Sequence, residues 1–217
     1  MKELFLLQIR IEIRKKSVIA SLILYLACLV FINYFALGFQ GVGAMPVIWS
    51  ALFWMVLLST LVSVIAKSFA AERSGSNIYL YSLASPAEII LSKIVYGFLL
   101  CCGICLIGFI FFGTVLSNPI QDTPLFLLTL VLASFGFSAS LSVLSAIASK
   151  TNNSSAVMAI LSFPVIVGIL LNAIKLTKNC IDGLDRSVSV DELITMAAIN
   201  IMVTSISYLL FPYIWRS

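Results

Sequence analysis

Residues 88–112 read EIILSKIVYGFLLCCGICLIGFIFF, and this stretch decides the fold class of the chain. Its two charged residues, Glu88 and Lys93, lie near its beginning, and no residue from Ile94 to Phe112 is charged. A helix of about 20 apolar residues crosses a hydrocarbon layer of about 30 Å. Lipid offers no hydrogen-bond partners, so the backbone of such a stretch must satisfy itself by forming a helix. The stretch is therefore predicted to be a transmembrane helix.

The same pattern recurs along the chain of 217 residues, of which 61% are hydrophobic and only 10% charged. That balance is typical of proteins that are solvated by lipid. Six apolar runs of membrane-spanning length are joined by short connections, which leaves no room for a separate soluble domain. We expect an all-α polytopic membrane protein that forms a single transmembrane domain over residues 1–217. The predicted spans are residues 18–37, 47–69, 88–112, 125–148, 155–174 and 195–214.

The basic residues are distributed unevenly between the two sides that these spans define. If the N-terminus is cytoplasmic, ten of the 13 Lys and Arg residues lie inside, and only Lys175, Lys178 and Arg186 lie outside. Cytoplasmic loops are enriched in Lys and Arg, so both termini are predicted to be cytoplasmic. Residues 1–16 fit the periodicity of a helix and of a strand. A lone strand would leave its edges unpaired, so we expect a helix that lies in the cytoplasmic interface.

Capping patterns predict where three of the helices begin. Residues 85–88 (SPAE) form a capping box with proline at the first helical position. Thr123 is the expected N-cap of the fourth span, because proline follows it. A second capping box, from Ser189 to Glu192, precedes the sixth span. The polar residues 175–193 are predicted to be an outer loop.

The longest inner connection, residues 70–85, is a candidate docking element for a soluble partner. It carries Glu72 and Arg73 and the aromatic pair Tyr79 and Tyr81. Aromatic side chains are favoured anchors at protein interfaces. Tyrosines are equally common at the level of lipid headgroups. The residues alone favour neither interpretation over the other.

Several kinds of chemistry are missing from the sequence. It contains no histidine, which excludes histidine ligands to haem or metal and a histidine general base. No pair of carboxylates lies at membrane depth, where ion-coupled transporters keep ionisable residues. No Gly-x-x-x-x-Gly-Lys-Ser/Thr loop is present either, so we do not expect the chain to hydrolyse ATP by itself. Energy for any uphill transport must then come from another subunit.

Cysteines and small residues inside the predicted spans are interpreted as packing groups. Cys101 and Cys105 lie four residues apart and could bind a soft metal, but apolar packing is the better interpretation. Cys180 is expected in the outer loop without a disulfide partner. The fourth span has a face of small residues that suits close helix packing, although such a face could also line a polar path. These residues are Ser134, Ser138, Ser142 and Ser145, with Gly136 and Ser140 nearby.

The order of short motifs along the chain resembles the CcmB family, the membrane subunit of the haem-exporter-type ABC complex of cytochrome c maturation. A basic N-terminal helix, six spans and an inner connection after the second span are similar to an ABC-2-type permease. The C-terminal motifs are similar to the version found in Bacteroidetes-type bacteria. The motifs that carry the resemblance are 47–52 (VIWSAL), 69–75 (FAAERSG), 83–93 (LASPAEIILSK), 146–150 (AIASK), 161–166 (LSFPVI), 179–186 (NCIDGLDR) and 208–213 (YLLFPY).

This resemblance implies a multi-pass protein of the cytoplasmic (inner) membrane that works with an ATPase subunit, CcmA, and with CcmC and CcmD. The complex uses ATP to release the haem-loaded chaperone CcmE. We expect a homodimer in which residues 74–85 form a coupling helix. We expect no cofactor bound directly by this chain, no metal and no nucleic-acid partner. The expected ATPase-coupling residues are Glu72, Arg73, Tyr79, Tyr81, Ser85, Pro86 and Glu88.

Two alternatives remain open at this point. The first is an ABC-2-type permease that exports a lipid, a glycan or a drug, because that class shares the architecture and differs in cargo. The second is a non-transporting membrane subunit that holds partners together. Replacing the inner connection distinguishes the second alternative, since a scaffold would tolerate the change without altered ATPase coupling.

Overall fold

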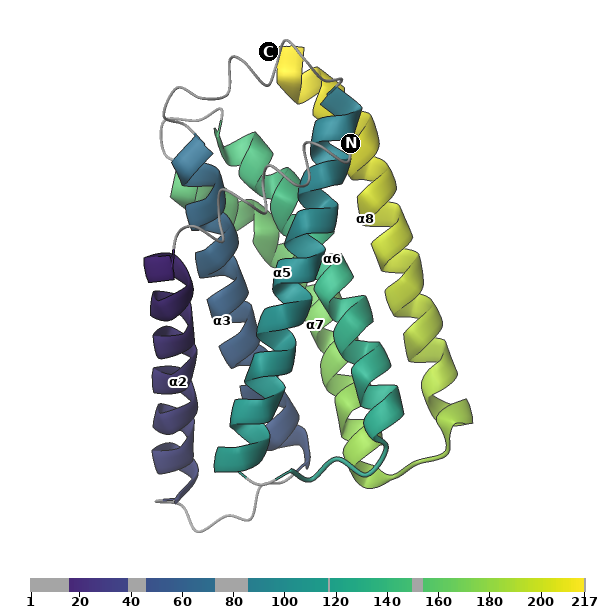
Figure 1. The fold of residues 1–217 in the computed structure, drawn as a ribbon. Coiled ribbons are helices and arrows are strands. Elements are labelled where there is room, and N and C mark those ends of the chain that lie inside the picture. The colour runs from purple at the N-terminus through teal and green to yellow at the C-terminus, as the bar shows by residue number, and fades with distance from the viewer. Residues whose placement is uncertain (1–15, 39–45, 73–85, 117, 150–153, 217) are drawn as a thin grey trace.

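The computed structural model shows long helices that run side by side (Figure 1). It describes the backbone of residues 16–38, 46–72, 86–116, 118–149 and 154–216, and no strand occurs in these ranges. Side chains are described for residues 23–35, 46–63, 88, 90–116, 118–144, 147 and 164–210. The helices are α2 (Lys16–Gly38), α3 (Pro46–Glu72), α5 (Pro86–Val115), α6 (Thr123–Ser149), α7 (Ser154–Asp182), the short 3-10 helix η1 (Arg186–Ser189) and α8 (Val190–Arg216).

Five of these helices contain stretches that are long and apolar enough to cross a membrane. Within the described residues these stretches are Pro46–Ser63, Ile90–Val115, Thr123–Leu144, Pro164–Asp182 and Arg186–Leu210. Helix α2 contributes a shorter described apolar segment, Ile23–Phe35, within its 23 residues. The chain is thus an all-helical, multi-pass membrane protein in its described part. The interfacial helix predicted for residues 1–16 lies outside the described residues, apart from Lys16, which begins α2.

Successive helices run in opposite directions, so the connections alternate between the two ends of the bundle (Figure 1). We name the end that holds the start of α2 and the end of α8 the inner end, and the opposite end the outer end. The starts of α5 and α7 and the ends of α3 and α6 also lie at the inner end. Lys175, Lys178 and Arg186 belong to the outer end, as the alternation of spans predicts.

Helix α6 is the centre of the bundle. It contacts α3, α5, α7 and α8, and 72% of its apolar stretch is buried. Only 17% of the apolar stretch that α8 carries is buried, which places α8 at the edge of the bundle. Helix α2 packs at another edge, against α3 and α5. Small residues explain the position of α6, because Ser134, Ser138 and Ser142 are buried and allow neighbouring helices to approach closely. The packing interpretation of this face therefore agrees with the structure, except at Ser145, whose side chain is not described.

The predicted outer loop, residues 175–193, is wrong over its first half. Helix α7 continues to Asp182, and Cys180 is buried in that helix instead of lying in a loop. The reason is an amphipathic pattern: Leu176 and Cys180 face the core, while Lys175 and Lys178 are exposed. Charged residues on one face gave this segment the polarity of a loop.

Other helix boundaries also differ from the sequence-based expectation or refine it. Helix α3 extends to Glu72, so the inner connection begins after residue 72 and not at residue 70. Helix α5 begins at Pro86, as the capping pattern predicts. Helix α8 begins at Val190, directly after Ser189, which agrees with the second predicted start. At α6 the expected N-cap is displaced by one residue, because Thr123 is already helical and the Asp122 Oδ1 atom accepts a hydrogen bond from the Leu125 N–H at 3.2 Å.

Candidate functional site

In the sequence, the predicted ATPase-coupling residues belong to the end of α3, the connection that follows it and the start of α5. Glu72 is the last residue of α3 and Pro86 is the first residue of α5. Glu88 is half-buried in the first turn of α5, where the helix dipole stabilises a negative charge. Arg73, Tyr79, Tyr81 and Ser85 lie outside the described residues. The structure therefore defines the two helices that flank the coupling segment, and the role of these seven residues stays a prediction.

Helix α3 is attached to the rest of the bundle by an aromatic cluster, which consists of Trp49, Phe53, Trp54, Phe109, Phe112, Phe126 and Phe137. Trp49 stacks on Phe53 with ring centroids 5.3 Å apart, and both rings meet Phe112 of α5 at 5.4 Å. Phe126 of α6 lies 5.6 Å from Phe53. Aromatic pairs at these distances add about 0.5–1.5 kcal/mol each beyond their burial. The cluster joins α3 firmly to α5 and α6.

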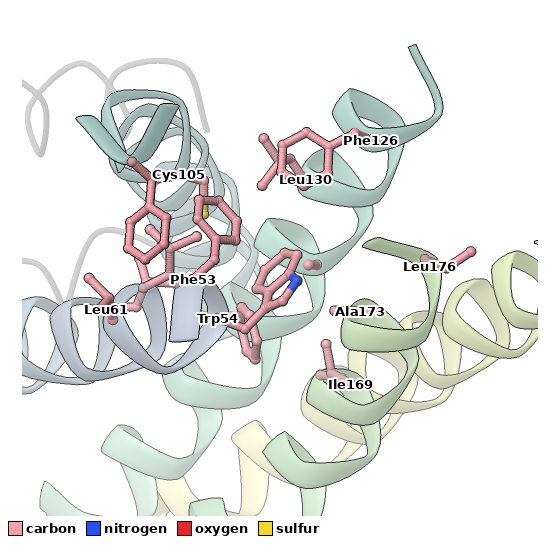
Figure 2. Packing of buried hydrophobic residues seen from close by; sticks show 14 of the residues in the cluster. Phe53, Trp54, Leu61, Cys105, Phe126, Leu130, Ile169, Ala173 and Leu176 are labelled. Atoms are coloured by element: carbon pink, nitrogen blue, oxygen red, sulfur yellow. The ribbon is translucent and has the colours of Figure 1, made fainter. Parts of the chain in front are cut away.

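A buried hydrogen bond joins α3 to α7. The Trp54 Nε1–H donates to the Thr177 Oγ1 atom at 2.9 Å, and both side chains are fully buried. The Thr177 hydroxyl in turn donates to the Ala173 carbonyl at 2.7 Å, so its hydrogen-bonding capacity is used in both directions. Figure 2 shows Trp54 extending from α3 toward the part of α7 that carries Ala173. A polar bond in such an apolar interior fixes the position of the two helices relative to each other.

Two further hydrogen bonds hold α6 to its neighbours at membrane depth. The Ser138 hydroxyl donates to the Ile94 carbonyl of α5 at 2.8 Å, beside Gly97. The Asn200 amide of α8 donates to the Leu132 carbonyl at 2.9 Å. Its Oδ1 atom has no hydrogen-bond partner and lies against Gly136, where a Cβ atom would approach it to 2.3 Å. Glycine at position 136 is thus required for Asn200 to reach the backbone of α6.

At the outer end a set of contacts connects the ends of the helices. We name this set the outer clasp, and it is made by residues 121–122, 179–184 and 186–189. Helix α7 ends in a Schellman arrangement, with Gly183 at φ +63° and the Leu184 N–H donating to the Asn179 carbonyl at 3.2 Å. The Cys180 carbonyl accepts backbone hydrogen bonds from residues 121 and 122, at 3.1 and 3.2 Å. The connection between α5 and α6 therefore caps the end of α7.

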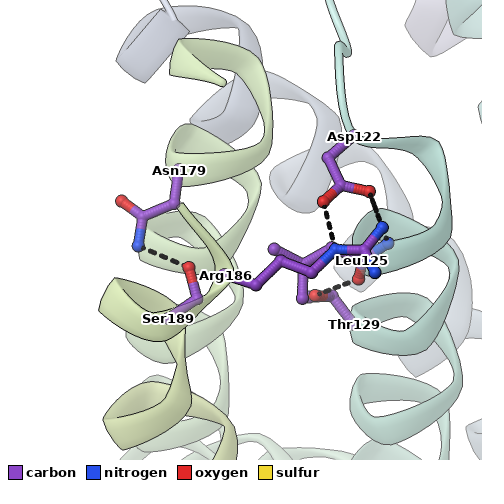
Figure 3. A network of polar contacts seen from close by, with 6 residues as sticks. All are labelled: Asp122, Leu125, Thr129, Asn179, Arg186 and Ser189. Atoms are coloured by element: carbon purple, nitrogen blue, oxygen red, sulfur yellow. Dashed lines mark hydrogen bonds and ion pairs between the residues drawn. The ribbon is translucent and has the colours of Figure 1, made fainter. Parts of the chain in front are cut away.

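Side chains tie α8 to the same outer clasp (Figure 3). Arg186 binds Asp122 through two hydrogen bonds, of 2.8 Å from Nε and 3.0 Å from Nη2. The Asn179 amide donates to the Ser189 hydroxyl at 3.0 Å, which links the end of α7 to the start of α8. The hydrogen bond and charge of Arg186 lower the pKa of the Asp122 carboxyl, together with the N–H of Leu125. The Asp122 carboxylate thus joins the start of α6 to η1.

The sequence-based candidates for metal binding in the described part of the chain are Cys101 and Cys105. No group of three or more Cys, Asp or Glu side chains gathers in the described part of the chain. Cys101 and Cys105 are both buried in the hydrophobic core, among the side chains that join α5 to α3 and α6. This environment agrees with their interpretation as packing residues.

Sequence reasoning missed the interhelical hydrogen bonds. A lone Asn within the apolar run of α8 is a usable signal, because a buried amide in lipid needs a partner. Neither its partner at Leu132 nor the Trp54–Thr177 pair follows from sequence, since the bonded residues are 68 and 123 positions apart. In the described arrangement, hydrogen bonds join the helices at the outer end, and α3 and α5 lead into the inner connection at the other end.

Two comparisons with known proteins bear on this arrangement. The family model described as CcmB protein matches residues 1–210 of the chain. The comparison with curated proteins finds no match.

Proposed function

The chain belongs to the CcmB family and is therefore a membrane component of the cytochrome c maturation system, and from this premise we propose that it is the permease subunit of an ABC-type complex. In this proposal a separate ATPase subunit, CcmA, hydrolyses ATP, and the chain uses the resulting movement to export haem or to release the haem-loaded chaperone CcmE. The observation that carries the proposal is the family match over residues 1–210, nearly the whole chain.

The proposed topology has six membrane spans with both termini in the cytoplasm. It is supported by the five apolar stretches and by α2, whose 23 residues extend about 34 Å along the helix axis, enough to cross a hydrocarbon core. The start of α2 and the end of α8 lie at one end of the bundle, as a six-span topology requires (Figure 1). The excess of basic residues in the connections assigned to that end supports an orientation in which the inner end faces the cytoplasm. The membrane is proposed to be the cytoplasmic (inner) membrane.

The inner connection is the proposed contact with the ATPase subunit. It leaves α3 after Glu72 and enters α5 at Pro86, so a force on it acts on two helices that pack against each other. Ser85, Pro86 and Glu88 are proposed to set the angle at which α5 begins. The residues proposed to contact the ATPase are Glu72, Arg73, Tyr79 and Tyr81.

The chain itself is proposed to bind neither ATP nor haem directly and to catalyse no reaction alone. The sequence has no phosphate-binding loop and no histidine, which supports energy supply and haem ligation by other subunits. We place it as a homodimer beside CcmC and CcmD, where it transmits motion. A haem spectrum with two protein ligands on the purified chain alone would contradict this division of roles.

The first experiment is a haem stain of membrane proteins from a deletion strain, with the haem-bound chaperone detected in the same gel. Loss of c-type cytochromes with haem still held on the chaperone is the result that the proposal requires. Normal c-type cytochromes would refute it and would favour export of a lipid, glycan or drug instead.

A Pro86→Ala, Glu88→Ala double variant tests the coupling role in the complemented strain. The variant should insert normally, but the complex that contains it should hydrolyse ATP without releasing the chaperone, because the entry into α5 is altered at the inner connection. A Gly103→Ala variant in the same helix is the matched control, since a Cβ atom there meets no atom within 4 Å. Failed insertion of the double variant, with a normal control, would show that these residues are only structural. A normal release ratio after replacement of the whole connection would favour the scaffold alternative.

A further inference from the structure

The hydrogen bond between Trp54 and Thr177 lies between the inner connection and the outer clasp, which are at opposite ends of the bundle. Along α3, Trp54 stands 18 residues before Glu72, about 27 Å along the helix axis from the inner connection. Along α7, Thr177 stands one turn before Cys180, whose carbonyl accepts the two backbone hydrogen bonds of the outer clasp. The bond therefore joins the helix that leaves the inner connection to the end of α7 that the outer clasp holds.

The surroundings of this bond make it stiff. The Trp54 ring is held between Phe53, with centroids 5.4 Å apart, and Phe137 of α6, at 6.2 Å. Thr177 is held by its second hydrogen bond, to the Ala173 carbonyl. Neither side chain can reach water, so breaking the bond would leave a buried indole N–H without a partner. Movement of α3 along its axis must carry α7 with it or break the bond.

A contrast within the same helix shows that the bond is not a general property of its tryptophans. Trp49 is also fully buried, but its Nε1 atom has no hydrogen-bond partner. The buried Thr60 hydroxyl of α3 donates to the carbonyl of Val56 in its own helix, at 2.8 Å, and so joins no second helix. These two residues supply matched controls for the loss of an indole N–H and the loss of a buried hydroxyl.

We propose that Trp54 and Thr177 are positioning residues that couple α3 to α7 and so transmit movement of the inner connection to the outer clasp. This inference rests on the proposed function, because it assigns to these two residues a step between ATP hydrolysis and the extracytoplasmic output. The link continues from Cys180 to Asp122 and through Arg186 to the start of α8. In this arrangement α7 moves with α3, although the two helices are separated by α5 and α6 in the sequence.

The test uses the complete complex in proteoliposomes and measures haem-loaded chaperone released per ATP hydrolysed. The variants are Trp54→Phe, Thr177→Val and the double variant, each of which removes the bond while keeping much of the side-chain volume. Thr177→Ser keeps the hydroxyl. Trp49→Phe and Thr60→Val are the matched controls. Thermal unfolding and the amount of assembled complex are recorded for every variant, so that instability is separated from uncoupling.

The expected result is a fall in chaperone released per ATP of about threefold, the factor that corresponds to one interhelical hydrogen bond in a membrane protein. The amount of chaperone released per ATP should fall equally in the two single variants and the double variant, because all three break the same bond. Thr177→Ser and both controls should release as the unmodified protein does.

Two outcomes would overturn the inference while leaving the proposed function intact. In the first, assembled Thr177→Val complexes release the chaperone at the normal ratio. In the second, Trp54→Phe and Thr177→Val lower thermal stability without changing the ratio, which would make the bond merely structural. If the unmodified complex shows no ATP-dependent release, the proposed function itself fails, and the inference fails with it.

Discussion

Replacing Gly136 by alanine should weaken the contact between α6 and α8, because the added Cβ atom would clash with the Asn200 side chain. A Cβ atom at this position would lie 2.3 Å from the Asn200 Oδ1 atom and 3.0 Å from the Ile169 Cδ1 atom. The Asn200 side chain cannot simply move away, because it is buried and its amide is bonded to the Leu132 carbonyl at 2.9 Å. The structure must therefore lose this hydrogen bond or push the two helices apart.

The magnitude follows from these two ways of relieving the clash. Losing an interhelical hydrogen bond in a membrane protein costs about 0.6 kcal/mol on average and at most about 1.7 kcal/mol. Overpacking of a close contact costs about 1–3 kcal/mol. Alanine offsets about 1 kcal/mol of this through its better helix propensity. Because the two costs are alternatives, overpacking less the propensity gain sets the upper bound, and we expect Gly136→Ala to lower the free energy of unfolding by up to about 2 kcal/mol.

A double-mutant cycle with Asn200→Ala isolates the cause. Asn200→Ala alone loses one hydrogen bond but also removes a buried oxygen that has no partner, so its cost should stay below about 1 kcal/mol. In the Asn200→Ala background the new Cβ atom has room, and Gly136→Ala should then cost almost nothing. Unfolding in mixed micelles with increasing sodium dodecyl sulfate, followed by tryptophan fluorescence, measures all four proteins. Additive effects within about 0.5 kcal/mol would refute the reasoning, and Gly103→Ala serves as the control.

Three further predictions concern the outer clasp. Gly183→Ala should destabilise the protein by about 1–2 kcal/mol, because alanine is strained at φ +63°, and a matched Gly113→Ala variant should not. The pKa of Asp122 is lowered in the folded protein, so its ion pair stabilises the protein above the ordinary carboxyl pKa of about 3.9 and is lost as pH falls through the lowered folded value. Thermal unfolding between pH 7 and pH 2 should show this loss in the unmodified protein and not in Asp122→Asn, and equal pH profiles would contradict it. Cys180 should resist a membrane-impermeant maleimide in intact cells until the protein is denatured, because it is buried in α7, whereas rapid labelling would restore the loop that the sequence suggested.

The start of α5 shows how far local sequence could specify this structure. Residues 85–88 contain a proline at a position where its missing N–H is harmless and a glutamate that favours a helix N-terminus, and α5 begins at Pro86. These signals are local, so the start of α5 can be predicted without knowledge of any other part of the chain. The same holds for the start of α8 after Ser189. The N-cap of α6 is Asp122 and not Thr123, and its carboxylate also binds Arg186, a contact over 64 residues that the local sequence does not reveal.

The extension of α7 shows where polarity misleads. Lys175, Lys178 and Asp182 made residues 175–182 look like a loop, yet a helix can expose one charged face at the end of a span. Lys178 and Asp182 even pair across one turn, with 3.8 Å between Nζ and Oδ2. The apolar residues Leu176 and Cys180, four positions apart, indicate a helix, whereas the charged residues between and around them indicate a loop.

By itself the sequence determined the class of the protein, the approximate places of its helices and the CcmB resemblance that the family match confirms. These follow from apolar runs and local capping patterns, because lipid forces any such run to satisfy its own backbone. Only the tertiary structure decided that α6 is the centre, that Asn200 reaches the backbone beside Gly136, and that Trp54 bonds Thr177. All these spans are apolar helices in lipid, and apolarity alone does not select a neighbour, so the choice of neighbours depends on side-chain shape and on hydrogen bonds between residues far apart in the chain.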